Sequence, residues 1–300
     1  MYKRQVITQK IKNHMKKKII YLLMKIKKMY KYKQLKKYYK KKCVFFEENK
    51  IDNSKDTVIL TIAFNNVYVI KEQIELIEKF CKNNYIHIIA DNSTDIKKRN
   101  EIKNICQKKI NVYYYSLPEK NPYNNYDSSS SHGASINYLW INILSKLDNI
   151  KYILLLDHDI FPTKEFDLKN MLYNTPFYGV VKERKMGWYL WPGFSCFKKN
   201  FCDRKKLDFL PSKYGDTGSA NYEILYKNFD LKTIKKASDV YVDLALQNVE
   251  KDDLYVDQKN KIEIIDDTWV HLINAADWAG TGSVEQKFKK MRDFMNNSLN

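Results

Sequence analysis

Apolar residues recur along this chain in two alternating patterns, short runs and stretches with a helical period. The short runs are typical of strands covered on both faces, and they predict strands at residues 57–64, 85–90, 111–116 and 152–156. Helical stretches lie between them, at residues 70–81, in a polar segment that ends near residue 108, and at residues 132–147. This alternation predicts βαβ units, and therefore an α/β fold with a mostly parallel central sheet flanked by helices.

The pattern is less regular elsewhere. Residues 121–131 are rich in Asn and Ser, which predicts a loop. Further strands are predicted at residues 178–181 and 262–265, and an amphipathic basic helix at residues 284–295. Residues 187–197 gather aromatic side chains around two glycines, which favours a core segment or, alternatively, an aromatic platform for a sugar ring.

The positive charge of the chain is concentrated at its N-terminus. The sequence has 53 Lys and Arg against 35 Asp and Glu, but residues 1–42 hold 17 of the basic residues and no acidic one. The rest of the chain therefore carries a net charge of only +1, without the basic stripe that indicates nucleic-acid binding. The longest apolar run of the segment, residues 19–24, is far shorter than the ~20 residues that span a bilayer.

Lys is interleaved with Ile, Leu, Met and Tyr in this segment, which predicts a basic amphipathic helical extension over residues 1–50. Such an extension favours contact of residues 1–42 with an anionic membrane surface. A solvated or partner-binding helix is the alternative. Because the segment lacks the apolar region and cleavage site of a secretory signal, we expect a cytoplasmic protein, with peripheral contact at the inner face of a membrane as a further expectation.

Cysteine and glycine usage exclude several function classes. The five cysteines are odd in number, scattered and without a C-x-x-C pair, which argues for a reducing compartment and against a zinc site. All eight glycines lie at or after Gly133, so the first strand-to-helix turns contain none. A dinucleotide-binding fingerprint or a Walker loop needs glycines in those turns. The phosphates of any bound nucleotide must therefore be neutralised by a metal held on carboxylates or by basic side chains.

Two acids separated by one residue follow the apolar run at residues 152–156. Asp157 and Asp159 therefore lie at the carboxyl end of a predicted parallel strand, where ligands of open α/β sheets bind. In a continuing strand the two carboxylates would face one way and His158 the other. Paired carboxylates suit a hard divalent cation that completes its shell with water and substrate phosphates. Two exposed acids at a solvated strand end are the alternative.

Other motifs stand in a fixed order around this pair. The second strand ends in ADNSTD, a G-x-x-x-N helix runs from Gly133 to Asn137, and a late His271 lies in TWVHLINAADW. In this order, residues 57–278 resemble the glycosyltransferases of the GT-A fold, most nearly their family 2-like group. The resemblance implies a GT-A glycosyltransferase domain over residues 51–300, Rossmann-like in architecture.

The resemblance also implies roles for individual residues. The acid after the second strand, Asp91, would hold the uracil or ribose of a UDP-sugar, and the D-x-D acids would contact the ribose and a Mn²⁺ or Mg²⁺ ion that bridges the diphosphate. The implied metal ligands are Asp157, Asp159 and His271. The implied donor-binding residues are Asp91, Asn92, Ser93, Asn137 and Asp157. Asn92 replaces the usual second acid and the customary glycine is absent, which leaves the nucleotide base open.

The implied reaction transfers a sugar from the nucleotide-diphosphate donor to a glycan or lipid-linked acceptor. For an inverting mechanism we expect Asp216, which lies between Gly215 and Gly218, to act as the general base, with Glu223 as the second candidate. A retaining outcome stays open. The chain lacks the Q-x-x-R-W signature of processive synthases. The alternatives are a nucleotidyltransferase that makes a sugar nucleotide, and a non-catalytic adaptor that binds membrane or RNA.

Overall fold

A computed structural model describes most of the chain. The described residues are 2–42, 44–45, 51–52, 54–119, 121–123, 127–203, 205–244, 248–250, 261–273, 275 and 284–298. The last residues of the region with the family resemblance, 276–278, and parts of the predicted extension and of the loop at 121–131 lie outside the described residues.

The central sheet has seven strands in the order β1-β4-β3-β2-β5-β8-β7. Their bounds are Val44–Phe45 (β1), Thr57–Ala63 (β2), Tyr85–Asp91 (β3), Val112–Ser116 (β4), Tyr152–Leu156 (β5), Phe177–Arg184 (β7) and Gly187–Lys198 (β8). β4, β3, β2 and β5 are parallel, whereas β1 and β8 run antiparallel to their neighbours. Every residue of β2 and β3 is buried, as their apolar runs predict.

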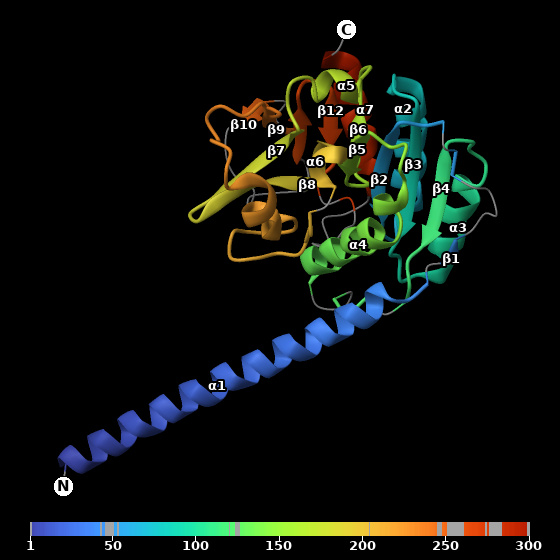
Figure 1. The fold of residues 1–300 in the computed structure, drawn as a ribbon. Coiled ribbons are helices and arrows are strands. Elements are labelled where there is room, and N and C mark those ends of the chain that lie inside the picture. Colours follow the sequence, from blue (N-terminus) through green and yellow to red (C-terminus); the bar gives the residue numbers. More distant parts are fainter. Residues whose placement is uncertain are drawn as a thin grey trace.

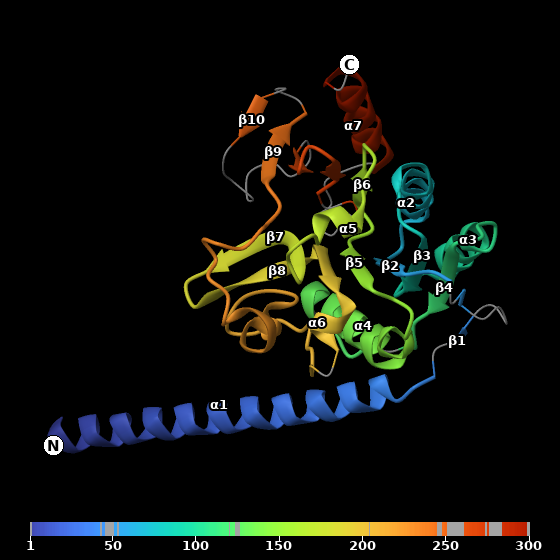
Figure 2. The ribbon, with the colours of Figure 1, turned by 45° about the horizontal axis from the view of Figure 1, so that its top comes forward.

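Helices cover both faces of this sheet (Figure 2). They are α2 (Val67–Phe80), α3 (Ile96–Cys106) and α4 (Ser128–Asn142). Ile74 of α2 and Ile102 of α3 belong to one apolar cluster with Ile89 of β3, and Ile136 of α4 belongs to another with Ile88. Ile88 and Ile89 are successive residues that point to opposite faces of a strand, so the two clusters lie on opposite sides of the sheet. The predicted α/β architecture is therefore confirmed.

A second, antiparallel sheet joins β10-β9-β11-β12-β6. Its strands are Ile160–Pro162 (β6), Asp239–Asp243 (β9), Asn248–Glu250 (β10), Lys261–Ile265 (β11) and Trp269–His271 (β12). The helix α7 (Val284–Ser298) inserts Phe288 between Tyr68 and Phe161, with ring centroids 5.2 and 5.1 Å away. The sequence predicted β11 and α7, but not this sheet. The remaining short elements of the described chain are α5 (Leu168–Met171), α6 (Lys199–Cys202), the 3₁₀ helices Leu144–Lys146 and Ser219–Asn221, and a π-helix at Tyr222–Tyr226.

The start of α4 differs from the prediction. The helix begins at Ser128 rather than at residue 132, because the carboxylate of Asp127 caps it by accepting a hydrogen bond from the backbone N of Ser130 at 3.1 Å. Serines that resemble a loop by composition therefore form the first turn of the helix. α4 also ends earlier than predicted, at Asn142.

The N-terminal segment forms one long helix, α1 (Tyr2–Tyr39), which projects from the body of the protein (Figure 1). Its last turns join the core: Leu35 and Tyr38 are buried, and the Tyr38 ring lies 5.3 Å from that of Tyr138 in α4. Farther out, apolar side chains from Ile19 to Tyr32 are mostly exposed. Among the described residues, every helix is too short or too polar to cross a membrane.

Candidate functional site

Asp157 and Asp159 lie in a tight turn that joins the two sheets. β5 ends at Leu156 and β6 begins at Ile160, whose backbone N donates to the carbonyl of Asp157 at 3.1 Å. The expectation that the strand continues through the D-x-D motif, with His158 facing away from the acids, was wrong. A turn releases the side chains from strand alternation, and His158 faces the same cavity as both acids.

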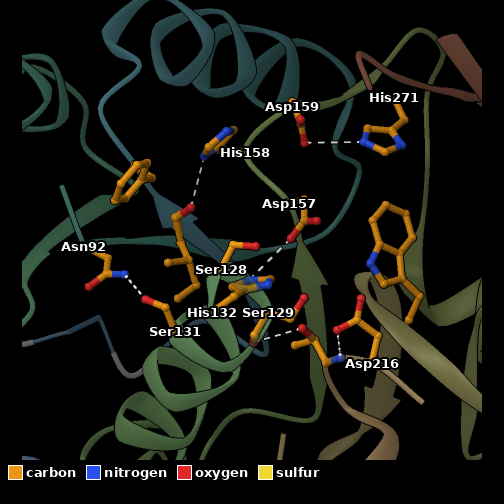
Figure 3. Close-up of a pocket in the computed structure, with 14 residues that line it drawn as sticks. Asn92, Ser128, Ser129, Ser131, His132, Asp157, His158, Asp159, Asp216 and His271 are labelled. Carbon is orange, nitrogen blue, oxygen red and sulfur yellow. Dashed lines mark hydrogen bonds and ion pairs between the residues drawn. The ribbon is translucent and has the colours of Figure 1, made fainter. Parts of the chain in front are cut away.

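The turn opens onto a cavity of about 280 Å³ at the carboxyl end of the parallel strands (Figure 3). Its lining combines carboxylates, imidazoles, hydroxyls and an indole. The lining residues are Ile62, Phe64, Asn92, Ser128, Ser129, Ser131, His132, Asp157, His158, Asp159, Trp191, Asp216, Thr217 and His271. Three of the predicted catalytic or metal-binding acids and the late histidine therefore meet in one cavity.

Asp159 and His271 face each other across this cavity (Figure 3). The Nε2 atom of His271 lies 3.6 Å from Oδ1 of Asp159, and its Nδ1 atom lies 2.7 Å from Oε2 of the buried Glu263. Burial alone would lower the pKa of His271, but the two carboxylates outweigh it and raise that pKa. Burial would raise the pKa of Glu263, yet His271 holds it down at about 2. Glu263 is therefore ionised and accepts a hydrogen bond from Nδ1–H of His271. This bond orients the ring so that Nε2 faces the cavity.

Asp157 pairs with a different imidazole. Its Oδ1 atom lies 3.3 Å from Nε2 of His132 in the second turn of α4. Burial raises the pKa of Asp157, His132 opposes that rise, and the charge of Asp159 adds to it. The two acids of the motif thus diverge toward two histidines from opposite sides of the cavity.

Asp216 reaches the cavity from a loop between β8 and the π-helix. Gly215 and Gly218 have φ values of +147° and +85°, and a Cβ atom at Gly215 would lie 2.4 Å from the Tyr189 ring. The turn is closed by a bond from Ser219 N to Asp216 O at 2.9 Å. The exposed Asp216 carboxylate accepts from the backbone N of Thr217 at 2.8 Å. The predicted glycine-flanked turn is present in the structure.

Glu223, the second candidate base, is not among the residues that line the cavity. Its carboxylate accepts from the Tyr214 hydroxyl and lies 3.6 Å from the Lys227 ammonium. Both contacts hold it on the outer surface of the π-helix.

The predicted nucleotide-binding segment reaches the cavity only through Asn92, whose Nδ2 donates to Ser131 Oγ at 3.0 Å. Asp91 is fully buried: its two oxygens accept from Ser93 N and from the Tyr114 hydroxyl, each at 2.8 Å. Burial raises the pKa of Asp91 against the effect of these hydrogen bonds. Asp91 and Ser93 therefore shape the turn behind Asn92.

Asn137 lies outside the cavity lining and has a packing role. Its Oδ1 accepts from Phe209 N at 2.8 Å, and its Nδ2 donates to Asp208 at 2.7 Å. Gly133, one turn earlier on the same face of α4, allows this segment to approach, because a Cβ atom there would lie 2.2 Å from the carbonyl oxygen of Phe209. The G-x-x-x-N spacing thus fits α4 against the segment that leads to Asp216.

Several lining residues escaped the sequence analysis. Ser128, Ser129 and His132 were assigned to a loop or to a helix start without a role, and the cap residue Asp127 was the available signal. Trp191 lies within the aromatic stretch that was a candidate sugar platform, and its ring centroid is 5.1 Å from that of His271.

The fold and cavity define an α/β protein with a cavity lined by acids at the carboxyl edge of parallel strands. No protein-family model and no curated protein sequence matches the chain. Solved structures similar to it include the mannosyltransferase Ktr4p from S. cerevisiae (12% identity, TM-score 0.33) and the mannosyltransferase PcManGT from Pyrobaculum calidifontis in complex with GDP-Man and Mn²⁺ (9%, 0.34). TarS 1-349 from S. aureus is similar to the same degree (13%, 0.35).

These matches cover 58%, 59% and 53% of this chain. They cover 65%, 53% and 52% of the solved chains, so this chain spans less than two thirds of each. The sequence identities and TM-scores are too low to assign the chain to a family. The assignment of function therefore depends on the chemistry of the cavity.

Proposed function

We propose that this protein is a GT-A glycosyltransferase that transfers a sugar from a nucleotide-diphosphate donor to a hydroxyl of a glycan or lipid-linked acceptor. One observation supports this most strongly. Asp157, Asp159, His271 and Asp216 belong to three segments far apart in sequence, yet they line a single cavity where parallel strands end. A cavity with acids on two sides suits a charged donor on one side and an activated hydroxyl on the other.

The residues fit a divalent cation. The two carboxylates are hard oxygen donors, and Glu263 holds His271 with Nε2 toward Asp159. In the part of the chain that the structure describes, no three His, Cys, Asp or Glu side chains are grouped closely enough to hold an ion alone. Asp157, Asp159 and His271 would therefore share Mn²⁺ or Mg²⁺ with water and the donor diphosphate. A bound cation would stabilise the charge on the departing nucleotide.

The remaining lining residues divide between donor and acceptor. Asn92 is the member of the predicted nucleotide-binding segment that reaches the cavity, so we assign it the nucleoside contact, with a UDP-sugar as the proposed donor. Trp191 lines the cavity beside His271, with ring centroids 5.1 Å apart, and we assign its indole to contact with a sugar ring. Asp216 would accept the proton of the attacking hydroxyl in an inverting reaction.

The direct test is a panel of nucleotide sugars incubated with the full chain and Mn²⁺. We expect hydrolysis of one UDP-sugar, and we expect chelation of the metal to stop it and Mn²⁺ or Mg²⁺ to restore it. The released nucleotide and the free sugar are measured by chromatography. A nucleotidyltransferase would instead release pyrophosphate from a nucleoside triphosphate and a sugar phosphate. That product pattern, or hydrolysis that persists after chelation, would exclude the proposal.

We also propose that α1 binds an anionic membrane surface. It is rich in Lys, has no acidic residue, and exposes apolar side chains along residues 19–32. Basic residues near such a surface contribute about 1 kcal/mol each, a contribution that salt screens.

This proposal predicts co-sedimentation of the full chain with phosphatidylserine vesicles at low salt, and a fall of at least about tenfold in bound protein when the ionic strength is raised. A chain that lacks residues 1–30 should stay in the supernatant, and it keeps Leu35 and Tyr38, which pack in the core. Equal binding to neutral phosphatidylcholine vesicles would contradict the electrostatic proposal. Catalysis on a water-soluble acceptor should survive the deletion, whereas an adaptor would lose its only activity.

A further inference from the structure

A buried side chain of α2 holds the Asp157–Ile160 turn from behind. The side-chain amide of Gln73 donates two hydrogen bonds, to the carbonyl of Asp157 at 2.7 Å and to the carbonyl of Ile160 at 2.9 Å. Gln73 has no exposed surface. Both amide protons are thus used on the two ends of the turn that carries the D-x-D acids.

Two further buried side chains hold Gln73 in this orientation. The Thr61 hydroxyl, on β2, lies 2.9 Å from Oε1 of Gln73 and 3.0 Å from Nε2 of His87 on β3. Since the Gln73 nitrogen already donates to two carbonyls, its oxygen must accept the Thr61 proton. Nε2 of His87 must then donate to Thr61. The result is a directed chain of hydrogen bonds from β3 through β2 to the turn.

This series of hydrogen bonds is unusual for an apolar interface. Thr61, Gln73 and His87 are each at most 1% exposed, and Nδ1 of His87 is buried without a hydrogen-bond partner. Burial lowers the pKa of His87 to about 3, so the ring is neutral and keeps the single proton that the chain needs. Apolar side chains could fill the same space at lower desolvation cost. The hydrogen bonds of Thr61, Gln73 and His87 therefore have a role in fixing the geometry of the turn.

Further backbone hydrogen bonds join the turn to β8 and to the residue that follows β12. The backbone N of Asp157 donates to the Gly193 carbonyl in β8 at 2.8 Å, and the carbonyl of Asp159 accepts from Leu272 N at 2.8 Å. Gln73 supplies the link to α2 that these bonds lack.

We propose that Gln73 is a positioning residue that fixes the Asp157–Ile160 turn, so that Asp157 and Asp159 keep facing the cavity. Its consequence for catalysis rests on the proposed function, whereas its effect on the turn does not. Gln73→Met keeps the length of the side chain and removes both donors. Asn83→Leu is the matched control, because Asn83 is another buried amide whose nitrogen and oxygen both form hydrogen bonds at the start of α5, away from the cavity lining.

Two measurements on the full chain test the proposal, both below the melting temperature of each variant. Hydrogen–deuterium exchange of peptides that cover residues 157–160 should be faster in Gln73→Met than in the wild type and unchanged in Asn83→Leu. Titration with Mn²⁺ in the presence of UDP should show an affinity about 10–100-fold weaker in Gln73→Met, the range expected when a residue that orients ligands is removed. Equal exchange in all three proteins would overturn the positioning role.

The outcomes separate this proposal from the proposed function. If the wild type binds no Mn²⁺ with UDP present, the metal-dependent function fails, and the exchange data still decide whether Gln73 fixes the turn. Unchanged Mn²⁺ affinity in Gln73→Met with faster exchange would overturn the link to the ligand site. If Gln73→Met does not fold, Thr61→Val is the second variant. It keeps the Gln73 donors and should show a smaller increase in exchange at the same peptides.

Discussion

Asp157→Asn and Asp159→Asn are each expected to lower the Mn²⁺-dependent turnover of the donor by about 10²–10³-fold, the usual loss when one group that stabilises developing charge is removed. The two carboxylates face the same cavity but approach different histidines, His132 and His271. Neither acid can therefore substitute for the other. Turnover is measured as nucleotide released per enzyme in the panel assay.

The folded state should tolerate both substitutions. Burial raises the pKa of Asp157, which means that its charge is less stable in the fold than in water, and a neutral Asn removes that unfavourable charge. Asp159 accepts from Ala275 N at 3.3 Å, and an Asn oxygen can accept the same bond. Melting temperatures should stay within about 2–4 °C of the wild type. Asp148→Asn, on an exposed surface, is the matched control, and full turnover in both cavity variants would reject the site.

The sequence predicted the parallel strands of the central sheet because they are buried on both faces, whereas it gave no strand for β1 or β8. The apolar runs of β2, β3 and β5 need no pairing information to be recognised. The order of motifs also predicted that Asp159 and His271 share a site, and they lie 3.6 Å apart. Acids at the carboxyl ends of buried strands can be recognised from the sequence, because the topology of the fold determines where those strand ends lie.

Glu263 was not predictable in the same way, because its role depends on strand register. β11 and β12 form a hairpin that places Glu263 directly opposite His271. Asp266 and Asp267 in its connection have φ values of +51° and +50°. A hairpin with this geometry normally carries Asn-Gly or Asp-Gly, so the Asp-Asp pair gave no turn signal. Without the hairpin, a glutamate within a late strand has no visible partner.

Asp91 and Asn137, which were predicted to bind the donor, do not line the cavity, and the reason is different. Both are polar residues next to the expected ligand edge, and sequence position does not show whether a polar side chain turns toward ligand or protein. The Tyr114 hydroxyl takes one oxygen of Asp91, and the backbone of Phe209 takes the oxygen of Asn137. Buried polar groups require such partners, and the partners come from segments that only the tertiary fold brings close.

Asp216→Asn is expected to lower transfer to the acceptor by about 10²–10⁴-fold, because the variant cannot accept the proton of the attacking hydroxyl. The Asn side chain can still accept the hydrogen bond from Thr217 N, and the glycine-flanked turn should keep its shape. Binding of the nucleotide product should therefore change little, since we assign Asp216 to the acceptor side. Transfer is measured with the donor and acceptor that the panel identifies.

Glu223→Gln supplies the matched comparison, because the two candidate bases differ in place rather than in chemistry. Glu223 contacts Tyr214 and Lys227 outside the cavity lining, so its substitution should leave transfer within about twofold of the wild type. An anionic nucleophile such as azide has no proton to lose, so it should restore turnover in Asp216→Asn if the missing step is proton removal. A loss of transfer in Glu223→Gln with full activity in Asp216→Asn would move the base to the π-helix. Full activity in both variants would instead remove the reason to place a carboxylate base on the acceptor side, and a retaining route would then fit the cavity better.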